Sequence, residues 1–314
     1  MAFLLTILGS SSALPTSERH PAAHVLNIHE RFFLIDCGEG TQMQLRKYRI
    51  RMGKLHHIFI SHVHGDHVFG IYGLLSSLSL LGREYPLHVY APSHFGALLR
   101  QHLADFDIHL GYELVFHPLH HSRSEKIYED DRLMVETLPL KHRVPALGFL
   151  FREKPRPRNI FPEMIKKYNM SLKQIRQVKD GNDLELDNGT RVPFDELTYS
   201  KHVPVSYAYC SDTVYTESFL GKIRNVDVLY HEATYDGAME KRAAETGHST
   251  SLQAATLARK AGAGKLILGH FSARYKQIEP LVEEAQTIFP QTVAAVEGET
   301  YEVLPGGLPG SLSG

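Results

Sequence analysis

The sequence has little cysteine, no tryptophan, almost no net charge and no long apolar run. Only Cys37 and Cys210 occur among 314 residues, each beside an apolar, strand-like run. This excludes a disulfide framework, argues against thiolate zinc ligands and indicates a reducing cytoplasm. No apolar stretch reaches the roughly eighteen residues that span a bilayer, so we expect no membrane anchor. The net charge of −1 gives no sign of a polyanionic partner, whereas twenty histidines invite a metal hypothesis.

Short apolar runs alternate with helical patterns along most of the chain, and this alternation predicts an α/β fold. The N-terminal run reads as a core strand and not as a signal peptide, because no basic segment precedes it. Strand-like runs cover residues 3–8, 54–60, 87–90, 133–140, 205–210, 226–230 and 265–268. Helical apolar faces are formed by Leu74, Leu75, Leu78 and Leu81, and later by Leu252, Ala255, Leu257, Ala258 and Ala261.

A basic insertion interrupts this pattern. From Arg152 to Lys179, nine basic residues stand against two acidic residues, so a segment of net charge +7 lies on a body of net charge −8. It opens with KPRPRN, whose prolines disfavour regular structure, and continues with the helix-like FPEMIKKYN. Charge alone leaves two interpretations open, a solvated surface excursion or an arm that binds a polyanion. Residues 305–314, rich in Gly, Pro and Ser, predict a disordered tail.

The stretch SHVHGDH, residues 61–67, places three histidines and one aspartate in six consecutive positions. In an extended chain His62 and His64 project the same way, so both can reach one divalent ion. We expect Gly65 to permit a sharp turn, after which the following aspartate and histidine open a helix and reach a second ion. A polar surface without metal is the alternative, and it does not require so compact a cluster. The loop therefore predicts two metals held by one segment.

Two metal ions need more ligands than this loop provides. Loops at the carboxyl ends of strands converge at one edge of an α/β sheet, so the missing ligands should lie there. Three side chains follow strand-like runs: His142 after ETLPL, Asp212 after YAYCS and His270 after KLILG. Each alone also reads as a hydrogen-bonded loop residue. Together with the loop they complete a ligand set.

These motifs resemble those of the ribonuclease Z family, the tRNA 3′-end endonucleases of the metallo-β-lactamase superfamily. SHVHGDH carries the superfamily signature, and the paired HEAT and HST motifs point to this one family. The matches are HVFGIYGLL (67–75), LIDCGEGTQ (34–42), HRVPALGF (142–149), CSDT (210–213), HEATY (231–235), GHSTSLQAA (247–255) and GHFSARY (269–275). The resemblance implies an αββα sandwich of two mixed sheets flanked by helices. It implies a single domain over residues 1–304 with an inserted arm at about 159–199.

The resemblance also implies roles for individual residues. Asp36 would hold the metal loop by hydrogen bonds. Asp66 would accept the proton of the attacking water, and His248, held by Glu232, would protonate the departing ribose oxygen. A T-x-x-Q capping box that begins at Thr250 places His248 just before a helix start. Two zinc ions, or Mn²⁺ in their place, would be held by His62, His64 and His142 at one site and by Asp66, His67 and His270 at the other, with Asp212 bridging.

The implied activity is that of a cytoplasmic, zinc-dependent endoribonuclease. It would remove the 3′ trailer from precursor tRNA and leave a 3′-hydroxyl on the tRNA and a 5′-phosphate on the trailer. The basic arm would grip the tRNA elbow, and in a homodimer the arm of one subunit would serve the other. NMSLKQIRQ stands where the family has a Gly/Pro-rich arm motif. The candidate RNA contacts are Arg156, Arg158, Asn159, Lys166, Lys167, Lys173 and Arg176.

Two other functions stay open on the sequence. Another hydrolase of the superfamily, a thioesterase or a small-molecule phosphodiesterase, would share the seven ligands. It would need neither the basic insertion nor Glu232 paired with His248. A non-catalytic RNA-binding protein with a vestigial metal site would lack a ligand, and none of the seven is missing.

Overall fold

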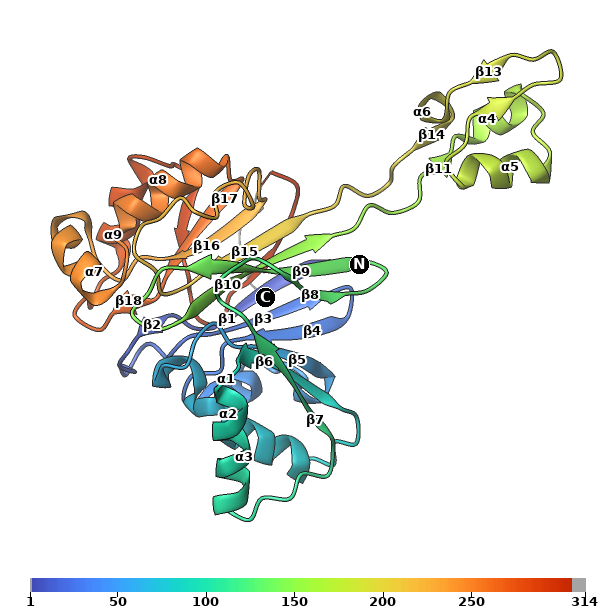
Figure 1. Cartoon of the computed structure of the whole chain (residues 1–314). Helices are drawn as coiled ribbons and strands as arrows, with labels where there is room; N and C mark the ends of the chain where they lie inside the picture. The colour runs from blue at the N-terminus through green and yellow to red at the C-terminus, as the bar shows by residue number, and fades with distance from the viewer. Residues whose placement is uncertain (1, 307–314) are drawn as a thin grey trace. The chain divides into compact units, whose positions relative to one another are not determined.

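The structure is a computed structural model, and it describes residues 2–306 of the chain. The chain divides into two compact units (Figure 1). The first lies within residues 1–129, 134–152 and 205–314, and the second comprises residues 130–133 and 153–204. The predicted arm, 159–199, falls inside the second unit, which begins earlier and ends later. Of the expected disordered tail, residues 307–314 lie outside the described residues.

The first unit contains two mixed seven-stranded sheets. One sheet has the order β20-β1-β3-β4-β5-β6-β7, with parallel pairing from β4 to β7. Its strands are β1 (Phe3–Gly9), β3 (Ala23–Ile28), β4 (Arg31–Ile35), β5 (Leu55–Phe59), β6 (Leu87–Pro92), β7 (Leu114–Leu119) and β20 (Thr300–Glu302). The other sheet has the order β19-β17-β16-β15-β10-β9-β8, with parallel pairing from β15 to β19. Its strands are β8 (Lys126–Glu129), β9 (Leu133–Leu140), β10 (Ala146–Glu153), β15 (Ser206–Cys210), β16 (Val228–Glu232), β17 (Lys265–Gly269) and β19 (Thr292–Ala294).

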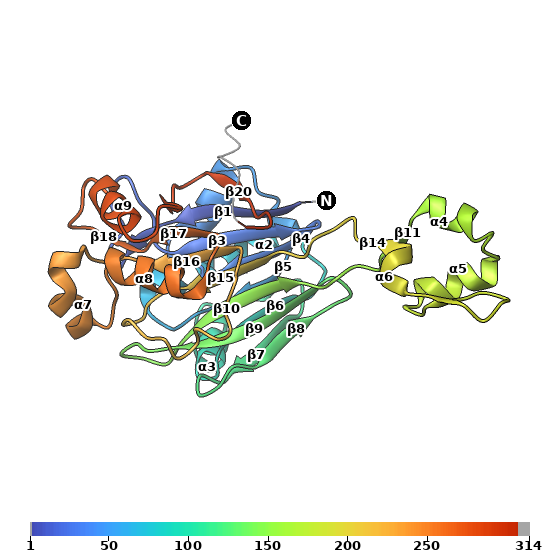
Figure 2. The same ribbon diagram turned by 90° about the horizontal axis from the view of Figure 1, so that it is seen from above.

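Helices cover the outer face of each sheet (Figures 1 and 2). The first sheet carries α1 (Thr41–Lys47), α2 (Gly65–Leu80) and α3 (Phe95–Asp105), and Leu74 and Leu78 of α2 pack into one apolar cluster with the strands. The second sheet carries α8 (Ser251–Ala261) and α9 (Glu279–Gln286), with a separate cluster of its own. The helix α7 (Glu240–Thr246) precedes α8. Within the described chain, no helix has the length and hydropathy needed to cross a bilayer.

Aromatic side chains fill the space between the two sheets. The ring of Phe59 lies 5.4 Å from that of Phe149 and 5.6 Å from that of Phe151, across the sheet interface. All three are fully buried. Such pairs add about 0.5–1.5 kcal/mol each beyond the area they bury. Helices, two sheets and helices thus form four layers, and the predicted αββα sandwich is confirmed.

The predicted strands and helices are present, with small changes at their ends. The capping box before α8 is confirmed, because Gln253 N donates to Thr250 Oγ1 at 3.3 Å and Thr250 N donates to Gln253 Oε1 at 3.1 Å. The apolar face predicted to include Leu81 ends earlier. Since α2 stops at Leu80, Leu81 is the C-cap residue and is 56% exposed.

The second unit has a small apolar core and regular structure of its own. Its two ends pair as β11 (Asn159–Ile160) and β14 (Thr198–Tyr199). NMSLKQIRQ forms a helix start, because the Ser171 hydroxyl and the Gln174 side chain make a capping box. Between the ends lie α4 (Pro162–Lys167), α5 (Leu172–Lys179), β12 (Leu184–Glu185), β13 (Arg191–Val192) and α6 (Phe194–Leu197). The core consists of Ile160, Met170, Val178, Leu184, Val192 and Leu197.

The charge of the second unit is divided along its sequence. The basic run up to Lys179 is followed at residues 180–196 by six acidic residues and one basic residue. Over residues 153–204 the totals are ten basic and eight acidic residues. The unit is therefore nearly neutral as a whole, with its positive charge concentrated on α4, α5 and the segment before them.

Candidate metal centre and active site

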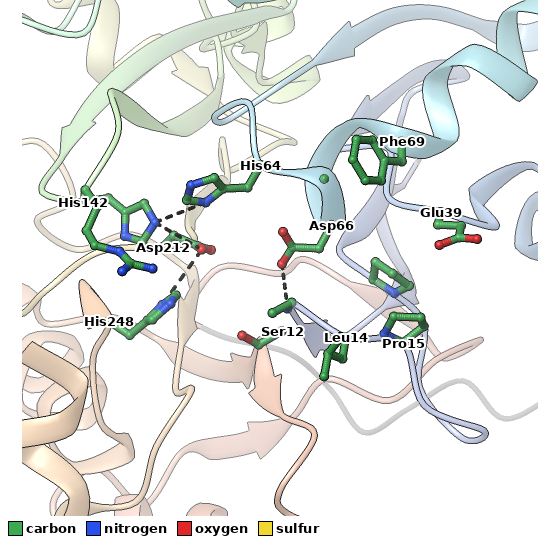
Figure 3. A pocket seen from close by; sticks show the side chains of 14 residues that line it. Ser12, Leu14, Pro15, Glu39, His64, Asp66, Phe69, His142, Asp212 and His248 are labelled. Carbon is green, nitrogen blue, oxygen red and sulfur yellow. Dashed lines mark hydrogen bonds and ion pairs between the residues drawn. The ribbon is translucent and has the colours of Figure 1, made fainter. Parts of the chain in front are cut away.

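The segments that follow the carboxyl ends of β5, β9, β15 and β17 bring all seven predicted ligands together. Figure 3 shows His64, Asp66, His142 and Asp212 among them. In the first group, His62 Nε2 lies 3.0 Å from His64 Nδ1, and His142 Nε2 lies 3.4 Å from the same atom. In the second group, His270 Nε2 lies 3.3 Å from His67 Nε2 and 3.4 Å from Asp66 Oδ2. Each group could hold one metal ion.

Asp212 lies between the two groups and turns one oxygen to each. Its Oδ2 is 3.5 Å from His62 Nε2, whereas its Oδ1 is 3.1 Å from His270 Nε2 and 3.3 Å from His67 Nε2. A tetrahedral zinc ion with ligands at about 2.0–2.1 Å has those ligands roughly 3.3 Å apart. The spacing and the donor types, imidazole nitrogen and carboxylate oxygen, both fit zinc.

Burial prepares the first group of histidines for metal binding. It lowers the pKa of His62 well below its usual value and also lowers the pKa of His64 and of His142. Neutral imidazoles offer a lone pair, which a metal ion requires. Burial disfavours the charged form of Asp212 too, but the neighbouring histidines, His270 first, hold its pKa well below the usual range. The first group therefore presents neutral nitrogens beside an ionised carboxylate. His67 of the second group differs: burial lowers its pKa, but the charges of Asp212 and Asp36 outweigh this and raise it well above its usual value.

Asp36 belongs to the support of the site and to neither ligand group. Its carboxylate accepts hydrogen bonds from Ser61 N, His67 Nδ1 and Tyr209 Oη, each at 2.7 Å. The bond to Nδ1 turns Nε2 of His67 toward the metal cluster, which is the usual role of such a partner. The sequence predicted the supporting role of Asp36 but not that of Tyr209. An apolar strand pattern does not show which tyrosine side chain contacts the opposite sheet.

The residue that orients His142 is Gly247. Its carbonyl oxygen lies 2.7 Å from His142 Nδ1, so Nε2 of that ring faces the cluster. Gly247 has φ of 84°, and a Cβ atom there would lie 2.7 Å from the same Nδ1. Both the left-handed backbone and the close approach of the ring require glycine at this position.

At Gly65 the chain passes from the extended His64 into α2 without a left-handed residue. Gly65 is the first residue of α2 and its φ is not positive. A Cβ atom at Gly65 would lie 2.3 Å from Cε2 of Phe69, one helical turn later. The glycine therefore makes room for an aromatic ring over the metal loop.

The buried Glu232 pairs with the partly buried His248 beside the ligands. His248 Nδ1 lies 3.0 Å from Glu232 Oε1, and Thr213 N and Thr234 Oγ1 donate to the same carboxylate at 2.8 and 2.6 Å. Burial disfavours the charged imidazole, but the charge of Glu232 and its hydrogen bond outweigh this and raise the pKa of His248 to about 9. His248 is thus protonated near neutral pH, and its Nε2 can donate to a bound substrate.

The predicted RNA contacts of the arm differ in their surroundings. Lys166, Lys167, Lys173 and Arg176 are exposed on α4 and α5. Arg158 instead serves the arm itself, because its guanidinium pairs with Asp195 and donates to the Thr198 carbonyl at 2.7 Å. Arg156 and Asn159 are partly buried.

A pocket of about 520 Å³ opens over the cluster and is lined by His64, Asp66, His142, Asp212 and His248. A histidine and aspartate cluster at the sheet edge of an αββα sandwich defines a metallo-β-lactamase fold protein. The structure is similar to that of the metallo-β-lactamase fold protein YhfI from Bacillus subtilis, with a TM-score of 0.67, 20% identity and coverage of 96% of this chain and 100% of that one. The description "Anti-Pycsar protein Apyc1" matches residues 3–109, which is too little of the chain to decide the family.

Longer matches give the family. The chain is 43% identical over 295 residues to the ribonuclease Z of Bacteroides fragilis, covering 94% of this chain and 97% of that one. Identity to the ribonuclease Z of Porphyromonas gingivalis is 43% over 296 residues, with the same coverage. The structure of human tRNase Z, short form, matches with a TM-score of 0.71 and 26% identity over 96% of this chain and 99% of that one. The chain belongs to the ribonuclease Z family, whose fold implies a divalent metal.

Proposed function

We propose that the protein is a zinc-dependent endoribonuclease that removes the 3′ trailer from tRNA precursors. The observation that carries this proposal is the His248–Glu232 pair, 3.0 Å apart and beside the ligand cluster. Hydrolysis of an RNA phosphodiester with release of the ribose 3′ oxygen needs a proton donor at that oxygen, because an alkoxide is a poor leaving group. A thioesterase has no such need.

Two zinc ions per subunit are supported by two ligand groups that share Asp212. His62, His64 and His142 would hold one ion, and Asp66, His67 and His270 the other. Two such ions, or Mn²⁺ in their place, would supply an activated water and neutralise charge on the phosphoryl oxygens. Side chains of the protein accept and donate the protons.

Two residues divide the proton transfers. Asp66, whose Oδ2 accepts a hydrogen bond from Ala13 N at 2.7 Å, is held at the cluster and accepts the proton of the attacking water. His248 donates a proton to the departing 3′ oxygen, and Glu232 stabilises the imidazolium in the correct orientation. The products are a tRNA with a 3′-hydroxyl and a trailer with a 5′-phosphate.

The second unit serves as the RNA-binding arm. Its exposed cations on α4 and α5 can contact the phosphates of the tRNA elbow, far from the scissile bond. This binding would fall steeply with salt concentration. Arg156 and Asn159, in the segment before α4, are candidates for contacts with the CCA terminus.

A homodimer is part of the same proposal. Large apolar side chains are exposed around the end of α2, where Leu80 is 88% and Tyr85 is 70% exposed. Such side chains are the usual centre of a subunit contact. If a second copy covers them, Leu80→Lys with Tyr85→Ala yields a monomer in sedimentation equilibrium, whereas an unchanged mass excludes this surface.

One assay tests the function. The purified protein is incubated with a 3′-extended precursor tRNA and, in parallel, with a bis-aryl phosphodiester, each with and without chelator. We expect both reactions to stop with chelator, and the released trailer to carry a 5′-phosphate. Hydrolysis of the aryl diester alone, with the precursor intact, would support a small-molecule phosphodiesterase and overturn the proposal.

A further inference from the structure

The pocket over the cluster has an apolar wall that no step of the proposed hydrolysis uses. Leu14, Pro15, Pro21 and Phe69 line it together with the ligands His64 and Asp66. Leu14 is 66% and Phe69 is 62% exposed. Figure 3 shows Leu14, Pro15 and Phe69 on one side of Asp66 and His142 and His248 on the other. Large apolar side chains left open beside a catalytic cluster indicate a place where substrate is bound.

Both parts of this wall contact the metal loop. The Phe69 ring lies against the backbone of Gly65, where a Cβ atom would come within 2.3 Å of the ring. On the other part, Ala13 N donates to Asp66 Oδ2 at 2.7 Å, and Ser11 Oγ donates to the Leu14 carbonyl at 2.8 Å. The loop held in this way is a preorganised part of the wall, which lowers the entropy that binding must overcome.

The charges around the pocket favour a base on this wall and the phosphate elsewhere. Glu39 also lines the pocket, and a carboxylate there repels a phosphate. Of the described residues that line the pocket, the one lysine or arginine is Arg143, next in sequence to the ligand His142. Nucleobases are flat and uncharged, and they stack on aromatic side chains in single-stranded RNA recognition.

We infer that Phe69, together with Leu14 on the same wall, binds the base of the first trailer nucleotide by stacking. The inference rests on the proposed function, which places the departing 3′ oxygen of the tRNA at His248. The first trailer nucleotide retains the phosphate, and it extends away from His248 toward the wall. The wall thus holds the trailer side of the scissile bond and aligns the phosphate over the ligands.

The test compares two precursors that differ only at the first trailer nucleotide, which is normal in one and abasic in the other. In single-turnover cleavage, we expect the normal protein to prefer the intact precursor by about tenfold to a hundredfold, from the usual strength of base stacking. Phe69→Ala should abolish the preference and Phe69→Tyr should retain it. Phe106→Ala, which removes an exposed ring outside the pocket, is the matched control and should behave as the normal protein.

A fluorescent base gives a readout that does not need cleavage. 2-Aminopurine at the first trailer position should be quenched on binding to the His248→Ala protein, and Phe69→Ala in that background should remove the quenching. If the normal protein quenches the probe on binding but does not cut any precursor, the proposed function is wrong, whereas base binding at Phe69 is supported. The inference is overturned if Phe69→Ala slows cleavage of both precursors equally. It is also overturned if the Phe69→Ala protein still prefers the intact precursor to the abasic one. A dimer that dissociates on Phe69→Ala would instead make the wall a subunit contact and also overturns it.

Discussion

Tyr209 Oη donates a 2.7 Å hydrogen bond to Asp36 Oδ2, and this bond joins the two sheets directly behind the metal ligands. Tyr209 belongs to β15, whose end carries Asp212, while Asp36 follows β4 and holds His67. The bond therefore connects the supports of ligands from both sheets.

Loss of this bond should weaken metal binding. Tyr209→Phe removes one hydroxyl and should lower zinc affinity by about tenfold, within the range found for the partners of metal ligands. Competition with a chromophoric chelator measures the affinity. The matched control is Tyr207→Phe, because Tyr207 Oη lies 3.0 Å from His24 and not at Asp36. Equal affinities in the two variants would show that the bond does not position the ligand.

His248→Ala should slow cleavage of precursor tRNA much more than hydrolysis of an aryl phosphodiester. Cleavage of precursor tRNA should fall by about 10²–10⁴-fold, the usual contribution of a general acid, because the 3′ oxygen needs its proton. Hydrolysis of a bis(p-nitrophenyl) phosphodiester should change much less, since nitrophenolate leaves without protonation. Rates on both substrates, measured at saturating zinc, provide the comparison. An equal loss on both would mean that His248 does not protonate the leaving group.

The pH profile should show the protonated state of His248. With its pKa raised to about 9, the ring carries the proton at neutral pH, so kcat for precursor should fall as the pH rises through that value. Glu232→Gln removes the charge that raises the pKa, and the fall should then begin at lower pH. Stopped-time assays from pH 6 to 10 measure this. If kcat falls at the same pH in Glu232→Gln as in the normal protein, the assigned role of Glu232 is contradicted.

Acid should destabilise the fold through His24. Burial lowers the pKa of this side chain to about 3, whereas the unfolded chain has the ordinary value near 6.5. Between these values the unfolded state binds the extra proton, so stability is full above pH 6.5 and falls as the pH decreases, by up to about 1.4 kcal/mol per pH unit. His24→Gln should reduce the slope of unfolding free energy against pH in urea titrations. His109→Gln, at an exposed position, should not; identical slopes in both would exclude His24 as the cause.

The arm can be removed at a defined point. Because Asn159 pairs with Tyr199, a short Gly-Ser turn in place of residues 160–198 keeps the two strands adjacent. Binding of precursor tRNA should weaken and lose part of its salt dependence, while hydrolysis of the aryl diester is retained. In the full chain, Lys166→Glu should lower the salt slope by about one, whereas the same change at Lys201, outside the basic segment, should not. Equal loss of both activities on deletion would refute the role of the arm.

The sequence predicted what depends on local pattern. Strands such as Leu133–Leu140 follow from apolar alternation. The ligands Asp212 and His270 follow because the parallel strands before them end at one edge. Contacts between sheets were not predictable, since Tyr209 looks like any buried strand residue. The reason for Gly65 was also missed, because a sequence shows which residue is small and not which ring needs the space. The arm has a core of its own, which its charge pattern did not reveal.

The division of the ligands between the two sheets has a consequence during synthesis. A nascent chain that has emerged from the ribosome as far as α2 already carries His62, His64, Asp66 and His67, but it lacks His142, Asp212 and His270. Its first sheet is also incomplete, because β1 waits for β20 near the other end of the chain. The ligand set is thus complete only once translation has passed His270, and a fragment that ends before Asp212 lacks a ligand of both groups.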